Sequence, residues 1–309
     1  MKNEGDRVTN VFRNIALSLA LALVLLIVYG LIEPQLLDVE EEEAGIPNLP
    51  EEWEGQEIAV LADFQIGMWL DNKSTVEEAI TEIVERDPSA VLLLGDYIYK
   101  PEDQSEQEVA QAIEVLQPLG EAEIPVYAVL GNHDYGLKKK DGNPAPEAAE
   151  RMRNALEALE IQILHNEAVT LDAEGAVLPE GESGLFIAGI GSRWADADEP
   201  AEALANIPAE APRVFMMHNP NSFEEFPADA APLAVAGHTH GGQISIPGLP
   251  EWSWVALTSE EPVHVDGWID GYGAPGNRLY VNRGIGMSAV PIRINAKPEL
   301  TIFTLTASE

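Results

Sequence analysis

Short apolar runs alternate with amphipathic stretches along the chain after residue 57. The runs at 58–62, 90–94 and 125–130 have the length of strands, and the stretches at 73–87 and 105–118 have the spacing of helices. This β-α-β-α-β order predicts an α/β fold, in which helices pack on the faces of a sheet.

The second half of the chain holds more strand patterns than helix patterns. A last strong helix is expected at 146–160, where Pro146 stands in a favourable first position. Because helices then become scarce, we expect mixed rather than purely parallel pairing, since parallel strands need long crossover connections. The later strands are expected at 161–164, 168–171, 185–190, 213–217, 233–236, 279–282 and 300–305.

An uncharged apolar run at 15–32 sets the N-terminal region apart. It approaches the ~20 residues that a helix needs to cross a bilayer, and Val11 and Phe12 extend it. Basic residues precede the run and acidic residues follow it, which predicts a single-pass anchor in the cell membrane with a cytoplasmic N-terminus and the rest of the chain outside. A cleaved signal peptide is the alternative, but its apolar region usually spans only about 7–15 residues.

The segment after this run is strongly acidic. Residues 33–57 contain ten acids, no base and three prolines, and like charges with proline favour an extended, self-repelling chain. The predicted organisation is therefore a cytoplasmic tail and transmembrane anchor at 1–32, an acidic tether at 33–56 and one folded domain at 57–309.

Charge and composition restrict the partners. The 309 residues include 53 acids and 17 bases, a net charge of −36, which excludes nucleic acid as a partner because phosphate binding requires basic surfaces. The chain has no cysteine, so any metal site must use histidine, carboxylate or amide ligands. Such acidity also suggests a halophilic domain, because an acidic surface repels anionic partners at low salt. At ~1 M salt the Debye length falls to ~3 Å, so this repulsion is screened.

Polar side chains follow five of the predicted strands, at the edge where ligands bind in open α/β sheets. Four of the six histidines lie in these clusters. Each cluster alone could be a turn or a helix cap, but together they predict a site for metal ions. The candidates are Asp63, Gln65, Asp96, Asn132, His133, His218, His238 and His240.

The order of these motifs resembles the calcineurin-like metallophosphoesterase family. The motifs read DFQ (63–65), GDYIY (95–99), GNHD (131–134), His218 and GHTH (237–240). The segment YVNRGIG…PIR…PELTIFTL is also similar to the membrane-anchored bacterial branch of that family. The resemblance implies an αββα sandwich of two mixed sheets, here preceded by one transmembrane helix, and a metal-dependent hydrolase of phosphomonoesters or phosphodiesters that uses metal-activated water.

The resemblance also implies roles for single residues. It makes Asp96 the carboxylate that bridges two divalent metal ions, and it makes His133 the catalytic residue that contacts the phosphate and protonates the leaving oxygen. Asp63, Gln65 and His240 would complete one metal site, and Asn132, His218 and His238 the other. These ligand types suit Mn, Fe, Zn or Mg, with Mn favoured.

Two positions depart from the family pattern. Gln65 stands where the family usually has histidine, so either its amide oxygen is a weaker, harder ligand that favours Mn²⁺ or Mg²⁺, or Gln65 binds nothing and that site is weak. Tyr99 stands where many members have the aspartate that orients the catalytic histidine. Asp134 or the Tyr99 hydroxyl could take that part.

Several other residues have both a functional and a structural interpretation. The basic cluster 138–140 could receive an anionic substrate or be a solvated loop, and Arg283 could reach a phosphate or form an ion pair. Three late tryptophans could form a rim for lipid or sugar, or belong to the core; they are Trp252, Trp254 and Trp268. We expect His165 and His264 to be structural.

Three functions remain open from the sequence. The first is a phosphoesterase acting on a small-molecule or lipid phosphate ester. The second is a lipid-linked pyrophosphate hydrolase with the same metal centre, which a position beside the bilayer would suit. The third is a non-catalytic binding module on the same fold, for which Gln65 and Tyr99 are the only support.

Overall fold

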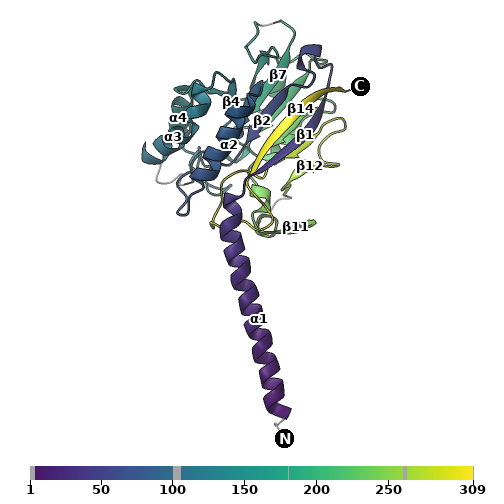
Figure 1. Cartoon of the computed structure of the whole chain (residues 1–309). Helices are drawn as coiled ribbons and strands as arrows, with labels where there is room; N and C mark the ends of the chain where they lie inside the picture. The colour runs from purple at the N-terminus through teal and green to yellow at the C-terminus, as the bar shows by residue number, and fades with distance from the viewer. Residues whose placement is uncertain (1–3, 100–105, 180, 260–262, 309) are drawn as a thin grey trace.

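A long N-terminal helix leads into a layered α/β domain (Figure 1). The computed structural model describes residues 4–99, 106–179, 181–259 and 263–308. Helix α1 (Glu4–Ile32) ends at the 3₁₀ turn η1 (Glu33–Gln35), where the domain begins. The carboxylate of Glu33 is buried and accepts hydrogen bonds from the backbone N–H groups of Asn295 and Ala296, which fixes the end of α1 to the domain.

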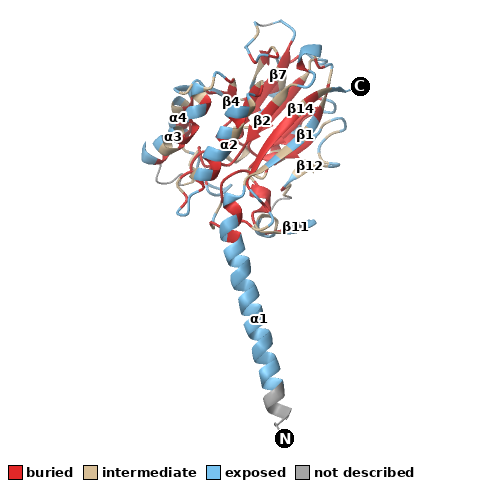
Figure 2. Cartoon of the chain, in the orientation of Figure 1, coloured by how far each residue is buried: buried red, intermediate tan, exposed pale blue. Residues whose placement is uncertain are grey.

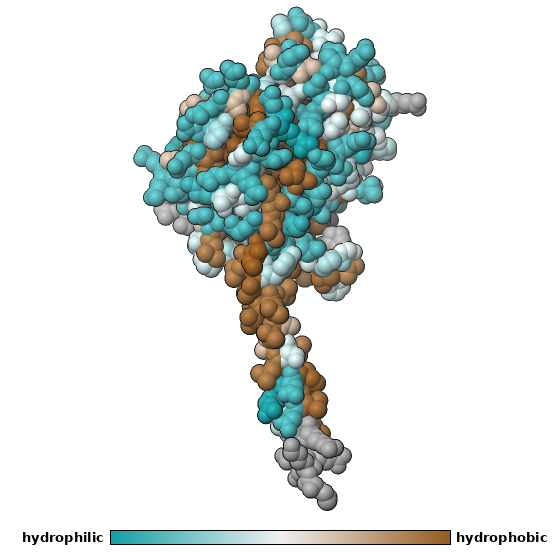
Figure 3. Space-filling model, in the orientation of Figure 1, coloured by the Kyte–Doolittle hydropathy of each residue, from teal (hydrophilic) through white to brown (hydrophobic). Residues whose placement is uncertain are grey.

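Helix α1 projects from the domain and exposes its apolar side chains (Figure 2). Residues 8–35 are long and apolar enough to cross a membrane, and only 6% of the most apolar window is buried. Figure 3 shows the hydrophobic colour of α1 against a mostly hydrophilic domain surface. A helix of this length, composition and exposure is a candidate for a membrane span.

The first sheet has six strands in the order β1-β14-β2-β3-β4-β5. Strands β2 to β5 are parallel to one another, β14 is antiparallel to β2, and β1 is parallel to β14. The sheet is therefore mixed, as the sequence predicts. Its strands are β1 (Asp38–Pro47), β2 (Glu57–Leu61), β3 (Ala90–Leu93), β4 (Val126–Ala128), β5 (Gln162–Ile163) and β14 (Glu299–Ser308).

The second sheet has the order β12-β13-β9-β8-β7-β6, with antiparallel strands at both edges and parallel pairs between them. Its strands are β6 (Glu167–Leu171), β7 (Leu185–Ile190), β8 (Arg213–Met217), β9 (Ala234–Ala236), β12 (Gly267–Ile269) and β13 (Leu279–Val281). A separate hairpin pairs β10 (Ser245–Ile246) with β11 (Leu249–Ser253).

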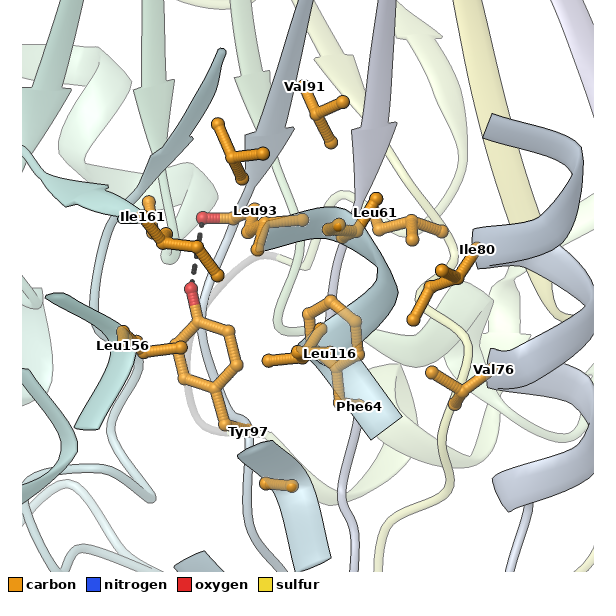
Figure 4. Packing of buried hydrophobic residues seen from close by; sticks show 14 of the residues in the cluster. Leu61, Phe64, Val76, Ile80, Val91, Leu93, Tyr97, Leu116, Leu156 and Ile161 are labelled. Carbon is orange, nitrogen blue, oxygen red and sulfur yellow. Dashed lines mark hydrogen bonds between the residues drawn. The ribbon is translucent and has the colours of Figure 1, made fainter. Parts of the chain in front are cut away.

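Helices cover the outer face of the first sheet. These are α2 (Lys73–Arg86), α3 (Glu106–Glu121) and α4 (Pro146–Glu157). Figure 4 shows Ile80, Leu116 and Leu156, one from each helix, turned toward Leu61 and Leu93 of the sheet. The apolar spacing that predicts these helices is thus the spacing that buries them.

The second sheet packs on the inner face of the first through a separate buried cluster, in which Val60 and Leu92 share a core with Ile187 and Met216. Among the described residues, short elements cover its outer face: the helix α5 (Pro200–Leu204) and the 3₁₀ turn η5 (Pro220–Glu225). The remaining short elements are α6 (Trp254–Thr258), η2 (Glu51–Trp53), η4 (Arg193–Ala195) and η6 (His240–Gly242). The predicted sandwich of two mixed sheets is confirmed, with a thin layer on its second side.

The acidic segment 33–56 is not the free tether that its composition predicts. Residues 38–47 form β1, which pairs with β14 over ten residue pairs, and Trp53 is fully buried. The acids of β1 alternate between the two faces: Asp38 and Glu40 bind Arg283, and Glu41 binds Arg86. Neutralisation by these arginines allows a run of like charges to form an edge strand, so the domain begins at residue 33 rather than 57.

Candidate active site

The predicted site residues meet at one edge of the sandwich, because five parallel strands from the two sheets end there. Asp63 follows β2, Asp96 follows β3 and Asn132 follows β4, while His218 and His238 follow β8 and β9 of the other sheet. The loops after β3 and β4 touch at Gly95 and Gly131, where a Cβ atom would collide with the opposite backbone or with the Asp96 carboxylate. Glycine is required there by close approach.

Five of the seven predicted metal ligands have backbone angles that side chains rarely adopt. Their φ values are positive, between 51° and 73°, at Asp63, Gln65, Asp96, His238 and His240. The left-handed region is unfavourable for residues with a Cβ atom, and such strain collects at functional sites. Each of these turns directs a polar side chain inward, which the pattern of residue types alone does not reveal.

Four side chains form one tight group around Asp96. The Nε2 atom of His218 lies 3.4 Å from Asp96 Oδ2, 3.0 Å from Asn132 Oδ1 and 3.1 Å from His238 Nδ1. On its other side, His218 Nδ1 lies 2.8 Å from the Leu94 carbonyl oxygen and donates to it. In the neutral form of His218 the Nε2 lone pair faces the group, as a metal-binding imidazole requires. Asp96, His218 and His238 together have the spacing of a metal site.

The other three predicted ligands make a second set of contacts next to this group. Gln65 donates from Nε2 to Asp96 Oδ2 at 2.9 Å, and His240 Nε2 lies 3.6 Å from Asp63 Oδ1. Asp63 Oδ1 and Gln65 Oε1 are both buried with no hydrogen-bond partner among the described residues. Buried oxygens without partners are costly, and a cation between them would satisfy both. This donor set therefore fits a divalent metal ion.

The buried titratable groups shift one another's pKa values. Burial raises the pKa of Asp96, but the charges of His218 and His133 outweigh burial and hold that pKa below its usual range. Burial lowers the pKa of His218, yet Asp96 beside it raises the pKa to about 9. Burial and the neighbouring His218 lower the pKa of His238 to about 3. Asp96 therefore stays charged and His238 stays neutral, as metal ligands do, whereas His218 must release its proton to bind a metal ion.

His133 borders the group without joining it. Its backbone N–H donates to Asp96 Oδ1 at 2.8 Å, and its ring Nδ1 lies 2.8 Å from the backbone carbonyl oxygen of Tyr99. The group that contacts the imidazole is thus the backbone carbonyl of Tyr99, whereas the sequence left open whether Asp134 or the Tyr99 hydroxyl takes that part. Backbone geometry can replace the family's aspartate at this position, so a search for a replacement side chain misses it.

Asp134 instead holds the loops together. Its carboxylate accepts hydrogen bonds from the backbone N–H groups of Asp96, Tyr97 and Gly131 at 2.8–3.1 Å. Arg293 has a similar supporting part that the sequence analysis did not assign: it is fully buried and donates to backbone carbonyls that include those of Gly284 and Ala296. Its only sequence signal is its place in the PIR segment.

A cavity of about 630 Å³ opens over the group. Its lining includes Asp96, Asn132, His133, His238 and His240. The lining also includes the basic cluster 138–140 and apolar groups from Trp194, Trp254 and Val255. Trp194 packs with its ring edge-on to His238, with 4.7 Å between ring centroids. The cavity can therefore receive a molecule with an anionic part and an apolar part.

The structural interpretation holds for most of the weaker candidates. Arg283 forms ion pairs with four carboxylates, among them the fully buried Glu299, and does not line the cavity. Trp268 is half-buried and packs against Tyr280 and Phe303 of the core, whereas Trp252 is exposed. His165 and His264 lie outside the described metal-ligand group and the cavity lining.

Comparison with known proteins identifies the fold and its chemistry. Residues 57–242 match the sequence profile of the Calcineurin-like phosphoesterase family. The chain belongs to this family. It is therefore a hydrolase that acts on phosphoester bonds, and its family implies two divalent metal ions.

Three relatives of this metallophosphoesterase cover most of its length. Phosphodiesterase YaeI of Escherichia coli (strain K12) is 30% identical and aligns over 80% of this chain and 81% of its own. The uncharacterized metallophosphoesterase YkuE of Bacillus subtilis (strain 168) is 26% identical over 90% and 88%. A transmembrane protein with metallophosphoesterase domain from Danio rerio is 24% identical over 95% and 63%.

Proposed function

We propose that this protein is a membrane-anchored, metal-dependent phosphoesterase that hydrolyses a phosphomonoester or phosphodiester. The observation that carries the proposal is the arrangement of donors around Asp96. Imidazoles and an amide oxygen lie close to its carboxylate, and two buried oxygens near it, Asp63 Oδ1 and Gln65 Oε1, have no hydrogen-bond partner among the described residues.

We assign the ligands accordingly. Asp96 would bridge two ions; Asp63, Gln65 and His240 would hold one, and Asn132, His218 and His238 the other. Two divalent ions in such a site polarise the phosphoryl oxygens and lower the pKa of bound water. The Gln65 amide group would serve both neighbours, because its nitrogen donates to Asp96 while its oxygen faces inward without a partner.

His133 is the proposed general acid. Its Nδ1 is held by the Tyr99 carbonyl and its ring lines the cavity, so its other nitrogen is available to contact the phosphate and protonate the leaving oxygen. Gln65 and Tyr99 depart from the family pattern and were the only support for a non-catalytic module. Because the Tyr99 carbonyl orients His133 and the Gln65 amide contacts Asp96, both residues are compatible with catalysis. We favour Mn²⁺ because Gln65 replaces an imidazole nitrogen by a harder oxygen.

The anchor sets the location. We propose that α1 crosses the cell membrane with the N-terminus in the cytoplasm and the domain outside, because Lys2, Arg7 and Arg13 precede the apolar run and acids follow it. A lipid-linked pyrophosphate is the second candidate substrate. In the cavity lining, the basic cluster 138–140 and the apolar groups of Trp254 and Val255 suit a molecule that combines charged phosphates with a lipid.

The test is activity together with metal content. Full-length protein in detergent should contain about two metal ions per chain by elemental analysis, and should hydrolyse bis-p-nitrophenyl phosphate or p-nitrophenyl phosphate with Mn²⁺. Asp96→Asn removes the bridging charge, so it should lower the metal content. It should also lower kcat/KM by at least about 10²-fold. His165→Gln, outside the site, is the matched control and should change neither. A folded, metal-loaded preparation that hydrolyses no soluble or lipid phosphate ester would refute the proposal.

A further inference from the structure

Exposed apolar side chains on the domain gather at one place. Outside α1, eleven large hydrophobic residues are exposed among those that the structure describes, and eight of them belong to three short segments. We call these eight residues the apolar rim: Leu36, Trp69, Leu70, Ile246, Leu249, Trp252, Trp254 and Leu257. Scattered single apolar residues are ordinary on a protein surface, but a cluster that includes three tryptophans marks a contact surface.

The first two rim segments adjoin the end of α1. Leu36 directly follows η1, which continues α1. Trp69 and Leu70 precede α2, whose first turn is bonded to η1: the hydroxyl of Thr75 donates to the Pro34 carbonyl oxygen at 2.9 Å. The hydroxyl of Ser74 likewise donates to the Gln35 side chain.

The third rim segment, from Ile246 to Leu257, adjoins the same point from the other side. Its hairpin begins where the backbone N–H of Ser245 donates to the Ile294 carbonyl oxygen at 3.0 Å. The neighbouring Arg293 N–H donates to the carbonyl oxygen of Gly30 in the last turns of α1. Figure 1 shows β11 at the end of the domain from which α1 emerges. Three segments far apart in sequence thus place apolar groups around the exit of one apolar helix.

We propose that the apolar rim lies in the headgroup region of the bilayer that α1 enters, as a second membrane contact. This inference rests on the proposed anchoring by α1. A bilayer spanned by α1 must end near Ile32, because Glu33 is the first charged residue after the apolar run. Residues close to the rim segments, Ser74, Thr75 and Arg293, are hydrogen-bonded to residues 30–35. These bonds hold the rim near the end of the span, where tryptophan is favoured and leucine reaches the acyl chains.

The rim also has a consequence for the site. Trp254 belongs both to the rim and to the lining of the cavity, and Val255 and Thr258 of the same short helix line the cavity as well. A rim seated on the bilayer therefore holds that part of the cavity lining beside the lipid headgroups. A phosphate ester whose apolar part remains in the membrane can then reach the metal-ligand group without leaving it.

Quenching of tryptophan fluorescence by brominated lipids tests the contact directly. The full chain is reconstituted in phosphatidylcholine vesicles with or without bromine on the acyl chains near the headgroup. The wild-type protein, which has six tryptophans, should lose a substantial fraction of its emission in brominated vesicles. The variant Trp69→Phe, Trp252→Phe, Trp254→Phe should lose a several-fold smaller fraction, because the remaining tryptophans are fully buried (Trp53) or half-buried (Trp194 and Trp268).

The matched control is Trp268→Phe, which removes a half-buried tryptophan and should leave the quenched fraction equal or higher. The three rim positions are exposed, so the triple variant should keep the circular dichroism and melting temperature of the wild type. An equal quenched fraction in wild type and triple variant would overturn the inference, as would a dimer that buries the rim between two copies. The quenching measurement needs no turnover, so it tests the membrane contact even if the proposed catalytic function fails. In a flotation assay, protein that does not float with the vesicles would instead refute the membrane anchor.

Discussion

At the scale of single residues, the site depends on backbone groups as much as on side chains. The residue types at the strand ends predict which side chains meet, because parallel strands end at a common edge. The orientation of each side chain could not be predicted. Gln65 and Asp96 point inward because their φ values are positive, and His133 is oriented by a carbonyl group that every residue type carries. Tertiary structure sets both features.

The carbonyl contact at Tyr99 leads to a test of His133. Tyr99→Phe removes only the hydroxyl, so the Nδ1 contact survives and kcat should stay within about twofold of the wild type. His133→Asn removes the proposed general acid and should lower kcat by about 10²–10⁴-fold. The loss should be larger for an alkyl phosphate ester than for a nitrophenyl ester, because the nitrophenolate leaving group needs less protonation. Steady-state kinetics on both esters measures the difference.

Two results would contradict this assignment. If Tyr99→Phe reduced kcat as strongly as His133→Asn, the hydroxyl and not the carbonyl would orient the ring. If His133→Asn affected alkyl and nitrophenyl esters equally, His133 would bind the phosphate without protonating the leaving group.

At the scale of elements, the sequence predicts the central strands and the covering helices well and the edges poorly. Strands β2, β3 and β8 are short apolar runs buried by both layers, so their composition reports their environment. Strand β1 is the opposite case. Its acids predict an open chain, and its pairing depends on β14, more than 250 residues away in sequence, and on arginines that no local pattern connects to it.

Arg283 and Arg86 both bind acids of β1, but they should contribute differently to stability, because Arg283 also pairs with a fully buried carboxylate. Arg283→Leu leaves the fully buried Glu299 without its cationic partner, and breaking a buried pair typically costs about 3–5 kcal/mol. Arg86→Leu is the matched control: two of its partners, Glu41 and Glu82, are well exposed, so the cost should be only about 0–1 kcal/mol per pair. Denaturant unfolding of the two variants measures this difference. Equal losses of unfolding free energy in the two variants would show that the pair of Arg283 with the buried Glu299 stabilises the protein no more than exposed pairs do.

At the scale of the whole molecule, the charge is distributed unevenly between the two parts. The first 32 residues hold three bases and two acids, so the remainder carries −37. That excess opposes the proposed chemistry, because a strongly negative domain repels anionic phosphate esters at long range. The cavity counters it locally with the basic cluster 138–140 and with a donor group that fits two cations. These short-range attractions can control substrate binding only when salt screens the negative field of the rest of the domain.

The same charge predicts how the protein responds to salt. Raising KCl from about 0.1 M to 1 M shortens the Debye length from ~10 Å to ~3 Å and weakens repulsion among the surface acids. We expect a higher melting temperature, by roughly 2–4 °C for each kcal/mol of relieved repulsion, and a lower KM for an anionic substrate. The variant Glu43→Gln, Glu51→Gln, Glu52→Gln removes three exposed charges and should gain less from salt than the wild type does. Thermal unfolding and kinetics across the salt series measure both effects, and a protein that loses activity and stability in molar KCl would not be halophilic.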